Sequence, residues 1–128
     1  MAPLQELAER WLACFNAKDL DGLLRLYADD AVHLSPKLKV KKPETAGFVR
    51  GQSALRAWWS EAFSQLPTLH YEKKAITAGA DRVLLEYTRV LNGEAPIGVA
   101  EVFEVGAAGK ITSSRVYHGV PLGDEGAS

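Results

Sequence analysis

The sequence predicts an α+β domain in which a cone-shaped, curved antiparallel sheet wraps over three N-terminal helices and encloses a cavity. In the first half of the chain, apolar residues recur at three- and four-residue spacing, which is typical of amphipathic helices. In the second half, four runs of strand-forming residues are separated by short turn sequences. The length of 128 residues, 47% of them hydrophobic, suits one domain over residues 1–128. The helices and the sheet must then bury their apolar faces on each other.

The three helices are expected over Pro3 to about Ala17, from Leu20 to the Asp29-Asp30 pair, and from Gly51 or Ser53 to Leu66. Pro3 suits a first helical turn, Asp19 suits an N-cap, and Pro67 ends the third helix. The apolar stripes are Leu4, Leu7, Ala8, Trp11, Leu12 and Phe15; Leu20, Leu23, Leu24 and Tyr27; and Leu55, Trp58, Trp59, Ala62, Phe63 and Leu66. Core packing is the default role for the three tryptophans, although one face of the Trp58–Trp59 pair can line a cavity.

A short strand is expected over Ala31 to Ser35, followed by a long basic loop over residues 36–50 that contains a short strand at most. Lysines in this loop either gate the cavity mouth, attract an anionic ligand or form an ordinary solvated surface.

The four later strands are Thr68 to Thr77, Arg82 to Leu91, Ile97 to Val105 and Lys110 to Gly119. Their short separators predict an antiparallel meander, and the tail over 120–128 is expected to fray.

Composition excludes several classes of function. The 15 basic and 16 acidic residues nearly cancel, so no global field favours nucleic acid or an anionic membrane as partner. The single cysteine, Cys14, forms no intrachain disulfide, and His33, His70 and His118 have no metal-ligand spacing. No run of 18 apolar residues and no signal sequence is visible. We therefore expect a cytoplasmic protein without metal or cofactor.

The order of elements resembles the nuclear-transport-factor-two-like superfamily, which includes ketosteroid isomerases, SnoaL-like polyketide cyclases, scytalone dehydratase and limonene epoxide hydrolase. The resemblance lies in Phe15-Asn-Ala-Lys-Asp-Leu-Asp-Gly22, in Leu26-Tyr-Ala-Asp-Asp-Ala31, in Gly51 and in Gly106-Ala-Ala-Gly-Lys-Ile111. It covers residues 4 to 119. It implies a cavity and a homodimer formed through the sheet, but one fold hosts many activities.

The resemblance also implies roles for single positions. Ser35 stands where ketosteroid isomerases have a carboxylate base, and Trp11 stands where they have a tyrosine donor. Glu101 takes the place of their protonated aspartic acid, and Tyr27 and Trp59 take the places of two tyrosines in their hydrogen-bond network. Because the base is lost and one donor is replaced, steroid isomerase activity is not expected.

Strand alternation makes Glu101 the main candidate, because Val99, Glu101 and Phe103 share one face of their strand. Burial there would raise its pKa and make it a neutral donor or a base near neutral pH. In the other register, Glu101 faces solvent or a dimer partner. His33 and Ser35 share the face that the resemblance makes inward, so His33 is either the acid–base partner of Glu101 or an ordinary core histidine.

Ser114, Val116 and His118 share one face of the last strand, which the resemblance makes the inward face, with His118 either at the cavity mouth or on the surface. Tyr87 is placed inward, although a one-residue slip would reverse it. Glu101 and His33 are thus the catalytic candidates. The ligand-binding candidates are Trp11, Tyr27, Ser35, Trp59, Tyr87 and His118.

Three hypotheses of function follow. The first is a cofactor-independent isomerase, cyclase, dehydratase or hydrolase acting on a small hydrophobic or cyclic carbonyl compound. The second is a non-catalytic ligand-binding or accessory dimeric protein, and the third is a structural dimer whose cavity is plugged.

Overall fold

The computed structural model describes residues 3–121 and begins with two of the expected helices. Helix α1 spans Pro3–Asn16, and helix α2 spans Leu20–Arg25 with the Asp19 side chain accepting from the Gly22 amide as its N-cap. Two further α-helices follow, α3 over Pro36–Lys41 and α4 over Gln52–Gln65, and η1 over Pro43–Thr45 is a 3₁₀ turn. Helix α4 begins and ends where the sequence predicts, with Gly51 as its N-cap at φ 90°.

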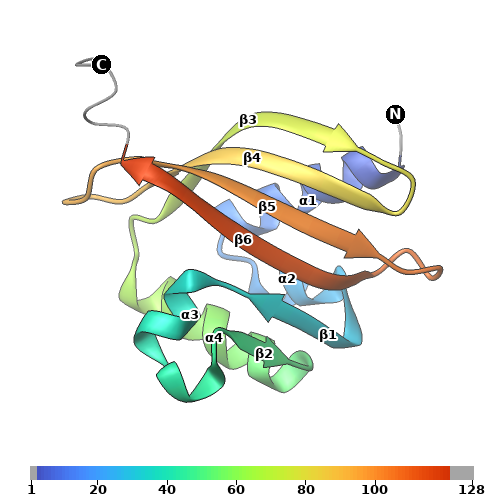
Figure 1. Cartoon of the computed structure of the whole chain (residues 1–128), viewed down its shortest axis with the longest axis horizontal. Helices are drawn as coiled ribbons and strands as arrows, with labels where there is room; N and C mark the ends of the chain where they lie inside the picture. The colour runs from blue at the N-terminus through green and yellow to red at the C-terminus, as the bar shows by residue number, and fades with distance from the viewer. Residues whose placement is uncertain (1–2, 122–128) are drawn as a thin grey trace.

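Six strands form one sheet in the order β2-β1-β6-β5-β4-β3 (Figure 1). The strands are β1 over Tyr27–Leu34, β2 over Phe48–Arg50, β3 over His70–Ala78, β4 over Arg82–Val90, β5 over Ile97–Val105 and β6 over Ile111–Pro121. The four long strands pair antiparallel in sequence order, as predicted. Strands β1 and β6 pair in parallel, so the sheet is mixed and not purely antiparallel.

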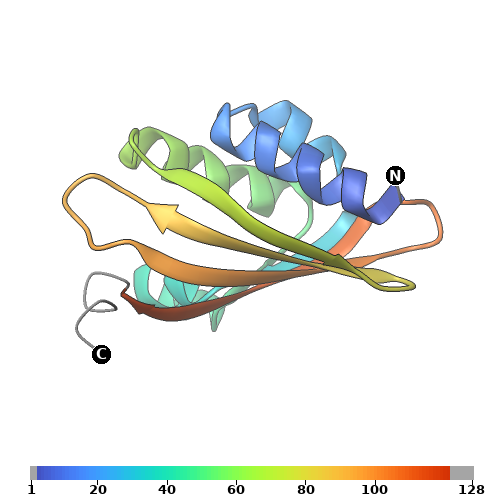
Figure 2. The same cartoon turned by 90° about the horizontal axis from the view of Figure 1, so that it is seen from above.

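Helices α1, α2 and α4 cover one face of the sheet (Figure 2). The buried core fills the space between these helices and the inward side chains of the long strands. On β5 the inward residues are Val99, Glu101 and Phe103, and all three are buried. The α+β class and the predicted faces of β5 are therefore confirmed.

Two expectations about the first half of the chain are wrong. Helix α2 ends at Arg25, so Tyr27 opens strand β1 and does not extend the helical stripe. The basic segment 36–50 contains the expected short strand, β2, but it is not a long loop, because α3 and η1 also lie in it. Ser35 caps α3 through its side chain and Pro36 occupies the first turn, and both are local signals for a helix start.

The described residues contain no helix long and apolar enough to cross a membrane. Of the tail predicted to fray, Val120 and Pro121 belong to β6. Residues 122–128 lie outside the described range, so that prediction is not addressed there.

Candidate functional site

A cavity of about 110 Å³ lies between the helices and the inner face of the sheet. Its walls come from α1, β1, α3, α4 and from the long strands, so segments far apart in the sequence meet around it. Aromatic rings of Trp11, Phe15, Trp58, Trp59 and Tyr71 form much of the wall. Walls of this kind, with a few polar groups, suit a small flat or cyclic apolar ligand.

Glu101 lies at the inner end of the cavity and is only 1% exposed. Its Oε1 accepts a hydrogen bond of 2.9 Å from the Tyr87 hydroxyl. Its Oε2 is buried and has no hydrogen-bond partner among the described residues. A buried polar atom without a partner costs about 1–3 kcal/mol. Oε2 is therefore the atom of this cavity that a ligand would satisfy.

His33 is placed beside Ser114 because β1 and β6 run in parallel, with these two residues in register. His33 Nδ1 lies 2.6 Å from Ser114 Oγ. The Tyr27 hydroxyl donates to the same Oγ at 2.9 Å, and Trp11 Nε1 donates to the Tyr27 hydroxyl at 3.0 Å. Four side chains from three elements thus form one buried chain of hydrogen bonds.

The direction of this chain follows from its first member. An indole N–H only donates, so the Tyr27 oxygen accepts from Trp11 and its proton goes to Ser114. The Ser114 proton then goes to His33 Nδ1, because it would otherwise be a buried donor without an acceptor. His33 therefore carries its own proton on Nε2, which makes no hydrogen bond with residues 3–121.

Burial neutralises both ionisable groups at the inner end. It raises the pKa of Glu101 to about 8, although the Tyr87 hydrogen bond works in the opposite direction. It lowers the pKa of His33 to about 3. Near pH 7 the site therefore presents a carboxylic acid and a neutral imidazole. Glu101 Oε2 and His33 Nδ1 are 4.0 Å apart, too far for a hydrogen bond, so they are neighbours and not a bonded pair.

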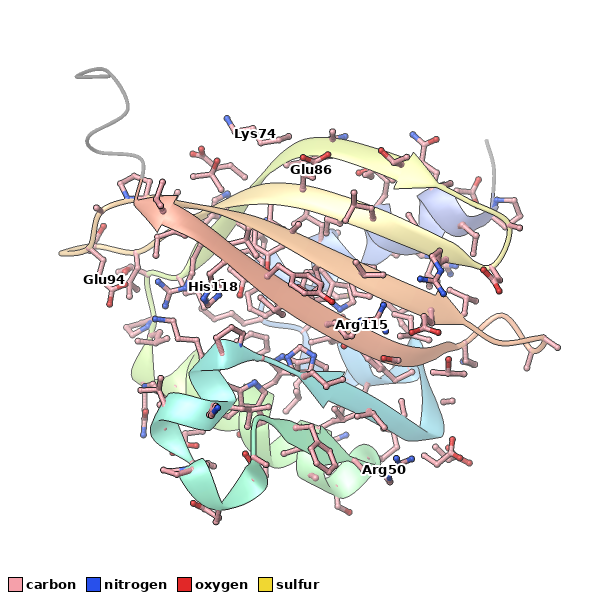
Figure 3. The ribbon with its side chains drawn as sticks, in the orientation of Figure 1. Arg50, Lys74, Glu86, Glu94, Arg115 and His118 are labelled. Atoms are coloured by element: carbon pink, nitrogen blue, oxygen red, sulfur yellow. The ribbon has the colours of Figure 1, made fainter. Side chains whose placement is uncertain are left out.

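The mouth of the cavity is charged. Arg89, Lys37 and Lys41 contribute positive charge, and Glu61 and Glu94 contribute negative charge. Arg89 Nη1 donates to Glu94 Oε1 at 2.8 Å, and this hydrogen bond lowers the pKa of Glu94. Glu94 and His118 lie at the same end of the sheet (Figure 3). Partial burial and the charges of Lys37 and Arg89 lower the pKa of His118.

The structure places six of the eight predicted site residues in the cavity wall: Trp11, His33, Ser35, Trp59, Glu101 and His118. The Ser35 hydroxyl also accepts from the Lys37 amide as the cap of α3. Tyr27 and Tyr87 are buried behind the wall, where they bond Ser114 and Glu101. The roles of all eight residues in binding or chemistry stay predictions.

The wall also contains residues that were not among the predicted site residues, and Tyr71 and Arg89 are two of them. Tyr71 of β3 stacks on Phe15 and on Tyr87, with ring centroids 4.1 Å apart in both pairs. Arg89 shares its face of β4 with Tyr87, and this alternation is a signal that could have identified it. Within residues 3–121, no group of three or more histidine, cysteine, aspartate or glutamate side chains is placed to hold a metal ion.

Comparison with known proteins shows what the chain is similar to. Residues 8–114 match the model of the SnoaL-like domain. A SnoaL-like protein of unknown function from Burkholderia thailandensis is 31% identical, with a TM-score of 0.85 over 94% of this chain and 97% of that chain. A protein with a ketosteroid isomerase-like fold from Catenulispora acidiphila, solved in complex with trimethylamine, is 18% identical, with a TM-score of 0.71 over 94% and 92%. A proposed polyketide cyclase from Sinorhizobium meliloti is 17% identical, with a TM-score of 0.74 over 91% and 100%.

Proposed function

The chain belongs to the SnoaL-like domain family, which has the nuclear-transport-factor-two-like fold, and from this premise we propose that its cavity binds a small hydrophobic or cyclic carbonyl compound. The observation that carries the proposal is the buried Oε2 of Glu101, which has no hydrogen-bond partner in the described part of the chain. With a pKa of about 8, Glu101 is protonated near pH 7 and donates a hydrogen bond to a carbonyl oxygen.

The cavity wall supports a small ligand. The volume of about 110 Å³ is somewhat below that of an apolar protein cavity of about 150 Å³ that holds benzene. A ligand of one ring therefore fits better than a fused ring system. The relative from Catenulispora acidiphila, which was solved with trimethylamine, also holds a small molecule.

The same groups can support acid–base chemistry without a cofactor. Above about pH 8 Glu101 is mainly a carboxylate, which can remove a proton from the carbon beside the carbonyl. The Nε2–H of His33, fixed by the chain from Trp11, can then donate to the enolate oxygen. This division of roles suits an isomerase or cyclase acting on a carbonyl compound.

The experiment uses cyclohexanone as the probe. Binding is measured by NMR line broadening, and exchange of its α-protons in D2O is followed over pH 6–9. We expect binding in the wild type and an exchange rate that rises towards pH 8. Glu101→Gln should abolish the exchange, whereas Glu86→Gln should not, because Glu86 is exposed on the outer face of β4. No binding of cyclohexanone or of other one-ring ketones would overturn the proposal.

A non-catalytic ligand-binding protein is the second candidate, and Ser35 favours it. Ser35 stands where the resemblance to ketosteroid isomerases expects a carboxylate base, and its hydroxyl is engaged in capping α3. Binding of cyclohexanone without faster exchange than in buffer would select this candidate.

We also propose a homodimer formed through the sheet. Its support is the outer face of β6, where Tyr117 and Val120 are 55% and 76% exposed. Exposed apolar side chains on one sheet face favour association. Light scattering after size exclusion should give twice the chain mass at micromolar concentration, and a clean monomer would contradict the dimer.

A further inference from the structure

Arg89 is a buried cation at the cavity mouth. Its side chain is 7% exposed, and it lies in the wall of the cavity. Within residues 3–121, the guanidinium donates one side-chain hydrogen bond, from Nη1 to Glu94 Oε1 at 2.8 Å. A guanidinium has five N–H donors, and a desolvated cation needs most of them engaged. The local ion pair therefore leaves donors of Arg89 available to a ligand.

The partner of Arg89, Glu94, has a half-exposed side chain. Glu94 belongs to the turn between β4 and β5, and its side chain is 46% exposed. A carboxylate in that setting gains little from a single ion pair, because water screens it and its side chain loses freedom. The carboxylate of a ligand, by contrast, can engage two N–H groups of the guanidinium in parallel.

Other positive groups surround the same point. Lys37 and Lys41 of α3 line the cavity, and their charges act on Glu94 together with that of Arg89. His118 of β6 also lines the cavity, but its lowered pKa leaves it mainly neutral near pH 7, so it adds no positive charge. The second carboxylate of the wall, Glu61, is held by Lys42 at 3.2 Å. An anion at the mouth would therefore meet an excess of positive charge.

We propose that the mouth is a carboxylate subsite, and that the ligand is a small carboxylic acid with a carbonyl-bearing ring directed at Glu101. The inference rests on the proposed function for the inner end, which supplies the neutral donor. It adds a second, charged point of recognition from a different set of residues.

The register of the strands sets the length of such a ligand. Glu101 pairs with Leu85 on β4 and with Val116 on β6. His118 is two positions beyond Val116, and Arg89 is four positions beyond Leu85. At about 3.3 Å per residue, the two backbone levels lie roughly 7 Å and roughly 13 Å from that of Glu101. The side chains of Glu101 and Arg89 both line the cavity and reach into this interval. A single ring with polar groups at opposite ends can therefore reach from one to the other.

The test compares two ligands with the same ring and almost the same size, 4-oxocyclohexanecarboxylate and 4-oxocyclohexanecarboxamide, of which the first is an anion and the second is neutral. Their affinities are measured by calorimetry at pH 7 and low salt. We expect the wild type to prefer the carboxylate by about ten-fold or more, as a charged hydrogen-bond pair allows. Arg89→Met should remove this preference and leave the affinity for the carboxamide within about two-fold.

Glu94→Gln supplies a test that does not depend on the folding of an Arg89 variant. It removes the internal carboxylate that competes for Arg89, so carboxylate affinity should rise several-fold while carboxamide affinity stays unchanged. Glu86→Gln is the matched control, because it removes one negative charge from the outer face of the sheet. It should change neither affinity.

The outcomes separate the two proposals. Equal affinities of the wild type for both ligands would overturn the carboxylate subsite and leave the role of Glu101 intact. The subsite would also be overturned if Arg89→Met weakened the binding of both ligands equally and Glu94→Gln did not raise the affinity for the carboxylate. The ion pair would then serve only to stabilise the β4–β5 turn. If Glu101→Leu, which removes the donor, leaves both affinities unchanged but the preference for carboxylate persists, the proposed role of Glu101 fails and the subsite stands.

Discussion

Glu101 and Glu94 line one cavity, yet their pKa values shift in opposite directions. At the inner end, burial raises the pKa of Glu101 to about 8, and among residues 3–121 only Tyr87 forms a hydrogen bond with its carboxyl group. At the mouth, the hydrogen bond from Arg89 lowers the pKa of Glu94, whose side chain remains half-exposed. Depth in the cavity thus decides whether a carboxyl group is a neutral donor or an anion. A ligand that fits both regions must be uncharged at one end and charged at the other.

The largest expected difference between the two regions is in stability. Trp11 is buried at the inner end, where its ring contacts the rings of Phe15, Tyr71, Tyr87 and Phe103. Trp11→Ala should lower the free energy of unfolding by about 3–5 kcal/mol, because it leaves a cavity and removes the N–H that donates to the Tyr27 hydroxyl. Lys41→Ala at the mouth should change it by less than about 0.5 kcal/mol. Urea unfolding of both variants tests this, and similar losses would contradict the contrast.

The pH dependence of stability separates the two glutamates by sign. The folded protein keeps the proton of Glu101 to about pH 8, whereas the unfolded chain loses it near the ordinary value of 4.5. The unfolded state binds fewer protons in this window, so stability falls as pH rises from 4.5 to 8. Each pKa unit of difference is worth about 1.4 kcal/mol, so the total fall is a few kcal/mol.

The free energy of unfolding of Glu101→Gln, measured over the same pH range, should not show this fall. The difference between the wild type and this variant separates the contribution of Glu101 from that of His33. His33, with its pKa lowered to about 3, stabilises the fold above pH 6.5 and loses that contribution as pH drops towards 3. For Glu94 the sign is that of a lowered carboxyl pKa, so its small contribution is lost as pH falls. A parallel pair of curves for wild type and Glu101→Gln would refute the neutral carboxyl group.

Ser114 joins the inner end into one hydrogen-bonded unit. Ser114→Ala should cost about 1–3 kcal/mol, because it leaves the proton of the Tyr27 hydroxyl without its acceptor and His33 Nδ1 without its donor. In this variant the proton of His33 should no longer be fixed on Nε2. The 15N chemical shifts of the two ring nitrogens measure this directly. Ser113→Ala, one residue earlier on the other face of β6, is the matched control. A His33 Nε2–H signal that survives unchanged in Ser114→Ala would contradict the assigned direction of the chain.

The smallest expected effect concerns Lys37 at the mouth. Lys37→Gln should leave stability within about 0.5 kcal/mol, because surface charges contribute little to folding. It should weaken binding of 4-oxocyclohexanecarboxylate a few-fold at low salt and flatten the dependence of that binding on ionic strength. Titrations at two salt concentrations measure both. An unchanged salt dependence would place Lys37 outside the carboxylate subsite.

Features that depend on a single strand or helix, such as which face a residue occupies, could be predicted from the sequence. Contacts between strands could not. Alternation along β5 placed Glu101 inward because Val99 and Phe103 flank it on the same face. The contact of His33 with Ser114 depends on the parallel pairing of β1 and β6, and neither strand encodes its partner or register. Helix α3 was not predicted because it is short and rich in lysine. Leu38 is its buried residue, and one such residue does not give a visible apolar stripe. Arg89 was not among the predicted site residues because a one-residue slip would turn its face of the strand, which it shares with Tyr87, outward.

The parallel pairing of β1 with β6 has a consequence for biosynthesis. His33 is made early and Ser114 is made among the last residues of the sheet, 81 positions later. On the ribosome, the N-terminal helices can form locally while β1 still lacks the neighbour that completes its edge. Because such long-range pairing forms slowly and late, the imidazole acquires its fixed tautomer only when the final strand docks. A nascent or truncated chain that ends before β6 therefore has no assembled pocket to offer a ligand.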